Sequence, residues 1–84
     1  MLKWEYYEQG YCAKAECEFG EYRAFSDGSW WGVERGGESR DHKLPTLDYS
    51  INQIELTKAA CDADYARRVA EIALANGYIK PVIE

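Results

Sequence analysis

The chain has little of what membrane proteins and secreted proteins need. No apolar run approaches the roughly 20 residues that span a bilayer. Histidine, methionine and proline are also rare, with one, one and two residues, respectively. The first residues, Met-Leu-Lys-Trp-Glu-Tyr, lack the apolar core of a signal peptide. We therefore expect a single domain over residues 1–84, located in the cytoplasm and making no membrane contact.

Cysteine is scarce, and its number is odd. Cys12, Cys17 and Cys61 cannot form a complete disulfide framework, which favours a reducing compartment. They have no Cys-x-x-Cys spacing, and the strands predicted below place Cys12 and Cys17 on opposite faces, so a zinc site with His42 is disfavoured. We expect inert thiols, no metal and no cofactor.

Known catalytic patterns are missing as well. The sequence has no glycine-rich phosphate loop, nucleophile elbow or His-Glu-x-x-His motif. His42 stands beside Asp41, but adjacent residues rarely form a catalytic hydrogen bond, and no nucleophile is implied. We therefore expect no catalytic residue and no enzymatic activity.

Basic residues are also fewer than acidic residues. Ten Lys and Arg against fifteen Asp and Glu give a net charge of −5, which opposes non-specific binding to nucleic acid or anionic lipid. Aromatic residues, in contrast, are abundant, with seven Tyr, three Trp and two Phe. They give a short chain enough apolar area for one sheet packed against one helix.

Residues 2–34 predict a four-stranded antiparallel meander, because apolar and polar residues alternate between three turn signals. The turns are Gln9-Gly10, Phe19-Gly20 and Asp27-Gly28. If each is a two-residue hairpin loop, one face sets large residues against small ones and the other pairs opposite charges across strands. In this register Trp31 faces the core and Trp30 lies on the solvated face.

The solvated face then gathers aromatic residues and an arginine. They are Tyr7, Arg23, Phe25 and Trp30. Three interpretations stay open: cross-strand pairs that only stabilise the hairpins, a face covered by the loop over residues 35–49, or a docking patch for a protein. The last is considered because aromatic side chains with arginine are typical of interface hot spots. The acidic residues Glu34, Glu38 and Asp41 form a second candidate surface, either as solubilising charge or as contacts for a basic partner.

Residues 35–49 predict a loop, residues 50–76 a helix that packs on one face of the sheet, and residues 78–84 a C-terminal tail. Ser50 and Gln53 have capping-box spacing, with Asn52 as a rival cap. The fold class is therefore α+β. The predicted core stripe of the helix is Ile54, Cys61, Tyr65, Val69 and Ile72.

Five alanines follow one another along a strip beside this stripe. They are Ala59, Ala63, Ala66, Ala70 and Ala73. They are either good helix formers on an exposed flank or a close-packing surface for a second copy or another partner, so a homodimer stays open.

Several motifs resemble those of a group of short proteins encoded by bacteriophages and prophages. They are Trp4, Gly10-Tyr11, Ala13, Gly20-Glu21-Tyr22, Trp30-Trp31-Gly32-Val33 and Lys58-Ala59-Ala60-Cys61-Asp62-Ala63-Asp64-Tyr65. The resemblance implies a small acidic accessory protein in the bacterial host cytoplasm. It implies action by stoichiometric protein binding, for example inhibition of a CRISPR-Cas defence complex as by anti-CRISPR proteins.

The sheet and helix also resemble the AP2-type DNA-binding module, whose sheet face enters the major groove. Lys3, Lys14 and Arg23 would then face the DNA. Glu5 and Glu16 lie on the same predicted face and weaken its affinity for phosphate. We therefore expect a protein partner and keep nucleic-acid binding as the alternative.

Overall fold

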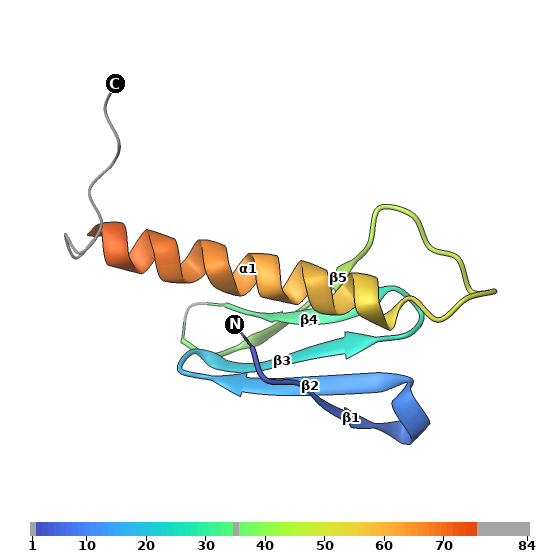
Figure 1. Ribbon diagram of the computed structural model, residues 1–84. Helices are drawn as coiled ribbons and strands as arrows, with labels where there is room; N and C mark the ends of the chain where they lie inside the picture. The colour runs from blue at the N-terminus through green and yellow to red at the C-terminus, as the bar shows by residue number, and fades with distance from the viewer. Residues whose placement is uncertain (1, 35, 76–84) are drawn as a thin grey trace.

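The computed structural model, which describes residues 2–34 and 36–75, is an α+β fold with a five-stranded antiparallel sheet and one helix (Figure 1). The elements are β1 (Glu5–Tyr7), the 3₁₀ turn η1 (Glu8–Gly10), β2 (Cys12–Cys17), β3 (Gly20–Phe25), β4 (Ser29–Val33), β5 (Ser39–Lys43) and α1 (Ile54–Ala75). The strands lie in chain order, β1-β2-β3-β4-β5. α1 covers one face of the sheet, and no other described element lies over the opposite face, here called the open sheet face (Figure 1).

The fifth strand corrects the prediction of a four-stranded sheet followed by a loop over residues 35–49. β5 is exposed along most of its length and has no apolar alternation, so its side chains carry no strand pattern. The backbone pairing with β4 holds it at the sheet edge. The His42 ring also stacks on Trp30, with 4.2 Å between ring centroids and 15° between the ring planes.

The first two hairpins keep every side chain on its predicted face. β1 pairs with β2 in the predicted register, with Tyr7 opposite Cys12. The pairing of β2 with β3 is shifted by two residues from the predicted register. Cys17 lies opposite Gly20, so the turn is Glu18-Phe19. The physical reason is Gly20, which has a φ of +140° and where a Cβ would lie 3.1 Å from Val33. A shift of two residues does not exchange the faces.

The third hairpin differs from the prediction by one residue, and this exchanges the faces of Trp30 and Trp31, whereas Val33 at the end of β4 stays in the core as predicted. Ala24 lies opposite Trp30, and Arg23 lies opposite Trp31. Trp30 therefore packs against the core on the helix side. Trp31 lies on the open sheet face, so the predicted placement of the two tryptophans is wrong.

The cause is the length of the turn between β3 and β4. Three residues connect the strands, and Gly28 takes a φ of +97°. The carboxylate oxygen Oδ1 of Asp27 accepts hydrogen bonds from the Ser29 N–H at 2.9 Å and the Ser29 hydroxyl at 2.6 Å. A three-residue loop ending in a glycine at positive φ is the next most common hairpin connection after the two-residue loop that we predicted.

α1 begins at Ile54, four residues after the predicted start at residue 50. Asn52, the rival cap, is the one used: its side-chain oxygen accepts the Ile54 N–H at 2.9 Å. Gln53 is buried and binds the preceding loop, where its Oε1 accepts the Asp48 N–H at 3.1 Å. The predicted end of the helix at residue 76 and the tail at 78–84 lie outside the described residues.

The core lies between the helix-facing side of the sheet and the first half of α1. Its buried apolar residues are Leu2, Ala13, Ala15, Tyr22, Ala24, Val33, Ile54 and Cys61. The strand alanines are small, which allows the helix to approach the sheet closely. The Thr57 hydroxyl is also buried and donates to a carbonyl oxygen, that of Phe25 at 3.1 Å or of Ile54 at 3.0 Å.

The predicted helix stripe is correct only in part. Ile54 and Cys61 are buried, and Tyr65 packs against the core. Val69 and Ile72 are 38% and 43% exposed. No helix in residues 2–34 and 36–75 is both long and apolar enough to cross a membrane.

Candidate functional site

The open sheet face carries a continuous row of five side chains, one from each strand. The register sets Glu5, Lys14, Arg23, Trp31 and Asp41 side by side. Tyr7, Cys12 and Phe25 form a second row beside it. The centre of the face is therefore aromatic and cationic, and both ends of the first row are acidic.

Arg23 lies at the centre of this face. Its guanidinium carbon is 5.7 Å from the centroid of the Tyr7 ring and 5.1 Å from that of the Trp31 ring. Such cation–π contacts are each worth about 0.5–1 kcal/mol at exposed sites. Nη1 donates to the Tyr7 hydroxyl at 3.3 Å, and Nε donates to the Glu21 carboxylate at 2.7 Å. These contacts fix a flexible side chain in one position.

Phe25 extends the group, because its ring lies 5.5 Å from that of Trp31 at an interplanar angle of 65°. We call Tyr7, Arg23, Phe25 and Trp31 the arginine–aromatic cluster. All four side chains are partly accessible to solvent. An edge-to-face aromatic pair beside a stacked arginine is a preformed surface, so little conformational entropy is lost when another molecule contacts it.

The ionisable groups of the cluster keep their ordinary charge near neutral pH. The hydrogen bond to Glu21 raises the pKa of Arg23 above its ordinary value, so the guanidinium is always charged. Burial raises the pKa of the Tyr7 hydroxyl, although Arg23 opposes this. Burial and the negative charge of Glu8 raise the pKa of Cys12, which therefore lacks the lowered pKa of a reactive thiol.

Three of the four residues predicted for the aromatic patch come together. Tyr7, Arg23 and Phe25 share the open sheet face as expected. Trp30 does not join them, since it stacks on His42 on the helix side. Trp31 takes its place. The signal that could have found it is Asp27-Gly28-Ser29, in which the aspartate can accept from the serine and extend the turn by one residue.

The predicted acidic surface separates into two parts. Asp41 lies on the open sheet face opposite Trp31 and belongs to the edge of the arginine–aromatic cluster. Glu34 and Glu38 lie at the connection between β4 and β5, where the Glu34 N–H donates to the Glu38 carbonyl oxygen at 2.6 Å. The Glu34 carboxylate is 3.6 Å from Arg40. These two acids are therefore remote from the cluster.

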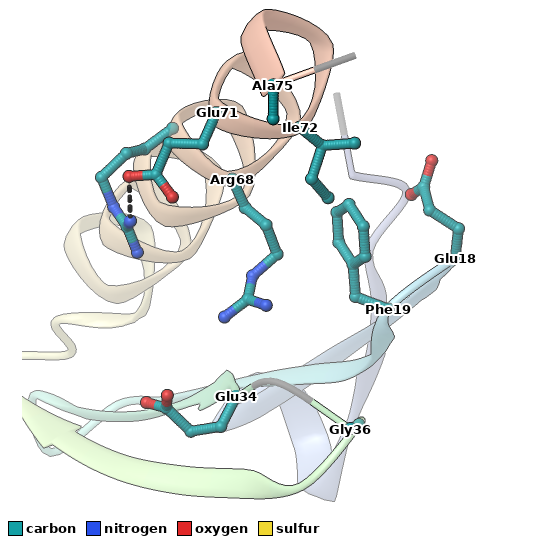
Figure 2. A pocket seen from close by; sticks show the side chains of 10 residues that line it. Glu18, Phe19, Glu34, Gly36, Arg68, Glu71, Ile72 and Ala75 are labelled. Atoms are coloured by element: carbon teal, nitrogen blue, oxygen red, sulfur yellow. Dashed lines mark hydrogen bonds and ion pairs between the residues drawn. The ribbon is translucent and has the colours of Figure 1, made fainter.

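A cleft of about 880 Å³ lies at the other end of the molecule, between the last turns of α1 and two strand connections (Figure 2). Its charged residues are Glu18, Glu34, Arg67, Arg68 and Glu71. Most of its polar groups bond to the protein itself. Glu18 accepts the Tyr65 hydroxyl at 2.7 Å, and Arg68 donates to the Val33 carbonyl oxygen while its guanidinium lies 5.5 Å from the Phe19 ring.

The geometry offers no metal centre within residues 2–34 and 36–75, where no three His, Cys, Asp or Glu side chains gather around one point. Cys12, Cys17 and Cys61 are free thiols. Cys61 is fully buried, and burial raises its pKa to about 12. Cys12 lies on the open sheet face and Cys17 packs against the core, as the alternation predicted.

No family model, curated protein or solved structure matches the chain. The resemblance to short bacteriophage proteins therefore stands on the motifs quoted above alone. The argument for function starts from the surface itself.

Proposed function

We propose that the chain acts by binding another protein through the arginine–aromatic cluster on its open sheet face. The observation that carries this proposal is Arg23, which is held between the rings of Tyr7 and Trp31 on a face that no described element covers. Arginine and large aromatic residues at the centre of a surface are the side chains most enriched in binding hot spots. Acidic and basic residues around them form the polar rim.

The charges on this face favour a protein over nucleic acid. Arg23 is already paired with Glu21, whose carboxylate lies 2.7 Å from Nε. Glu5 and Asp41 close the two ends of the central row. A surface that binds nucleic acid concentrates positive charge, because its affinity comes largely from phosphate contacts. Here carboxylates flank the two cations on the same face.

The strand pairing adds a second argument. Lys14 lies directly opposite Arg23, and Glu16 lies directly opposite Glu21. Like charges opposite each other destabilise a sheet by a few tenths of a kcal/mol to about 1 kcal/mol. Sequences usually avoid such pairs, and departures from local rules concentrate at functional sites. A partner with charges of the opposite pattern would relieve both repulsions.

The proposal of a binding protein also draws on the absence of a known catalytic motif from the sequence. The thiol on the open sheet face, Cys12, has a raised pKa and is therefore a poor nucleophile. Together with the bacteriophage-like motifs, this favours stoichiometric inhibition of a bacterial defence complex such as CRISPR-Cas. Nucleic-acid binding through Lys14 and Arg23 is the alternative that the same experiment tests.

The experiment is affinity purification of the tagged chain from bacterial lysate, with and without nuclease, using variants that separate the cluster from the rest of the surface. Trp31→Ala and Arg23→Lys remove aromatic area and the planar guanidinium, respectively. Tyr49→Ala is the matched control, because Tyr49 is 74% exposed and lies in the loop before the helix.

We expect a stoichiometric protein that survives nuclease, is retained by Tyr49→Ala and is lost with Trp31→Ala. Arg23→Lys should weaken its capture although the charge is kept. Recovery that depends on intact nucleic acid would overturn the proposal in favour of the alternative. Equal capture by Trp31→Ala and wild type would show that the partner binds elsewhere.

A further inference from the structure

α1 is apolar on two opposite sides. The side towards the sheet carries the buried residues Ile54, Thr57 and Cys61. The opposite side, the outer helix face, is apolar at six positions with alternating spacings of three and four: Leu56, Ala59, Ala63, Ala66, Ala70 and Ala73. All except Ala73 are exposed, and Leu56 is 56% exposed. A helix with only one packed side normally carries polar residues there, whereas a helix that is apolar all round is normally covered all round.

The spacing of the outer helix face is that of a coiled-coil seam, in which positions a and d of a seven-residue repeat are apolar. Leu56, Ala63 and Ala70 take position a. The flanking positions decide which partner fits, because they face each other across the seam. One flank holds Glu55, Asp62 and Val69, and the other holds Ala60, Arg67 and Leu74.

In a parallel pair of helices, each residue of the first flank meets the residue five positions later on the second flank of the partner helix. In this arrangement the two flanks are complementary to each other. Asp62 then meets Arg67 of the partner subunit, and the two-fold axis repeats this pair of opposite charges. Val69 meets Leu74 of the partner subunit. Both are large apolar residues that are otherwise 38% and 48% exposed, respectively.

The two charged residues can still take part in this pairing. The Oδ1 atom of Asp62 is buried within its own chain, without a hydrogen-bond partner among the described residues, so the partner's guanidinium would approach the other carboxylate oxygen. Lys58, one turn earlier, donates instead to Glu55 and to Tyr6. Arg67 uses Nη1 on Glu71 and Nη2 on Asp64, each at 2.8 Å. A guanidinium has five N–H groups, so Arg67 retains donors for a further carboxylate.

We infer that a second copy of the chain packs in parallel along the outer helix face, with Asp62 of each copy against Arg67 of the other. The alanines allow the two helix axes to approach to about 8 Å. The sheets lie on the far sides of the pair, because each helix meets its own sheet on the opposite face (Figure 1). An antiparallel pair would instead set Asp62 against Val69, which leaves the charge uncompensated. This inference concerns the helix and does not depend on the open sheet face.

The first test is the molar mass of the full chain by light scattering and sedimentation over a range of concentrations. A dimer has twice the chain mass of 9.6 kDa. Ala66→Glu places a charge in the seam and should give the monomer mass. Ala75→Glu is the matched control on the same helix outside the outer face, and it should remain dimeric. Circular dichroism checks that both variants keep their helix.

The second test separates the parallel pair from the antiparallel one. Ala59→Cys places two thiols across the seam in a parallel dimer, within the Cα separation of about 4.4–6.8 Å that a disulfide needs. In an antiparallel pair centred on the seam the same residues are 11 positions apart along the axis, about 16 Å. We expect a disulfide-linked dimer on a non-reducing gel, and none from wild type with its native cysteines.

Charge reversal gives the third test. Asp62→Arg and Arg67→Asp should each raise the dimer Kd about tenfold or more, because attraction becomes repulsion at two symmetric places. The double variant should restore the wild-type Kd. A wild-type chain that stays at the monomer mass up to several hundred micromolar would overturn the inference. So would a dimer that Ala75→Glu dissociates as readily as Ala66→Glu, or one that Ala59→Cys does not cross-link.

Discussion

Tyr22 joins the sheet to the helix through a partly buried hydrogen bond, and the removal of this bond is a direct test of the fold. The side chain is 0% exposed, and its hydroxyl donates to the Asp64 carboxylate oxygen Oδ2 at 2.7 Å. Tyr22→Phe keeps the ring, which packs edge-on against Tyr65 at 6.3 Å and 88°. The lost interaction is therefore the hydrogen bond to a charged acceptor, worth about 1.5–3 kcal/mol.

We expect Tyr22→Phe to lower the free energy of unfolding by about 2 kcal/mol at pH 7. For a domain of this size that corresponds to a fall in Tm of roughly 8–16 °C. Urea denaturation followed by circular dichroism at 222 nm measures the first quantity, and a thermal melt measures the second. The slope of the urea transition should not change, because the surface exposed on unfolding is nearly the same.

The effect should depend on pH in a defined direction. Burial raises the pKa of Asp64, but the hydrogen bonds from Arg67 and Tyr22 and the charges of Arg67 and Arg68 outweigh it, so the folded-state pKa is lowered. A lowered folded pKa gives stability that is present above the ordinary pKa of 3.8 and is lost as the pH falls through the folded value. Burial and Asp64 together raise the pKa of the Tyr22 hydroxyl, so the donor keeps its proton at neutral pH.

The difference between wild type and Tyr22→Phe should therefore be constant from about pH 5 to pH 8 and shrink in acid. Tyr65→Phe is the matched control. Its hydroxyl also donates to a carboxylate at 2.7 Å, that of Glu18, but on the surface of the molecule. A surface bond of this kind contributes little, so the loss should be clearly smaller. Equal losses in the two variants, or no loss in Tyr22→Phe, would refute the reasoning.

Three further predictions concern the tryptophans, two turn glycines and the buried thiol of Cys61. Trp30→Ala should destabilise the fold by about 2–4 kcal/mol in a urea titration, and Trp31→Ala by much less, because Trp30 packs on the core; the opposite order would contradict the observed register. Gly28→Ala should destabilise more than Gly10→Ala, since both have positive φ but a Cβ at Gly28 would lie 2.5 Å from another side chain and one at Gly10 would meet nothing. Cys61 should react with a thiol reagent only on unfolding, since its thiol is fully buried and its pKa is raised to about 12; rapid labelling of three thiols in the folded protein would contradict this.

The sequence predicts the faces of the sheet correctly where the register of a hairpin is as expected or shifts by two residues. It predicts them wrongly where a side chain lengthens a turn by one residue. Alternation places Tyr7, Arg23 and Phe25 on one face whether a hairpin shifts by zero or by two residues. Trp31 could not be placed in the same way, because the faces of β4 depend on whether the turn before it has two or three residues. The deciding contact is between Asp27 and Ser29, and Asp-Gly alone favours the shorter loop.

β5 could not be predicted from its side chains at all. Ser39–Lys43 is polar on both faces, so its strand structure comes from pairing with β4 and not from local preference. The side-chain contact that accompanies the pairing of β5 with β4 is that of His42, whose ring stacks on Trp30 beside Gly32. A Cβ at Gly32 would lie 3.1 Å from each of the two rings, so the glycine makes room for the stack. A sequence pattern does not reveal such a cross-strand fit.

The predicted core stripe of the helix is wrong at Val69 and Ile72 because the helix is longer than the sheet. α1 has 22 residues, about 33 Å at 1.5 Å per residue, whereas strands of five or six residues span about 17–20 Å. The last turns of the helix therefore extend past the sheet (Figure 1). The same periodic stripe is core in the first half of α1 and partly exposed in the second. A sheet this short does not account for the apolar residues of so long a helix, and Val69 lies on the flank that a second copy would cover.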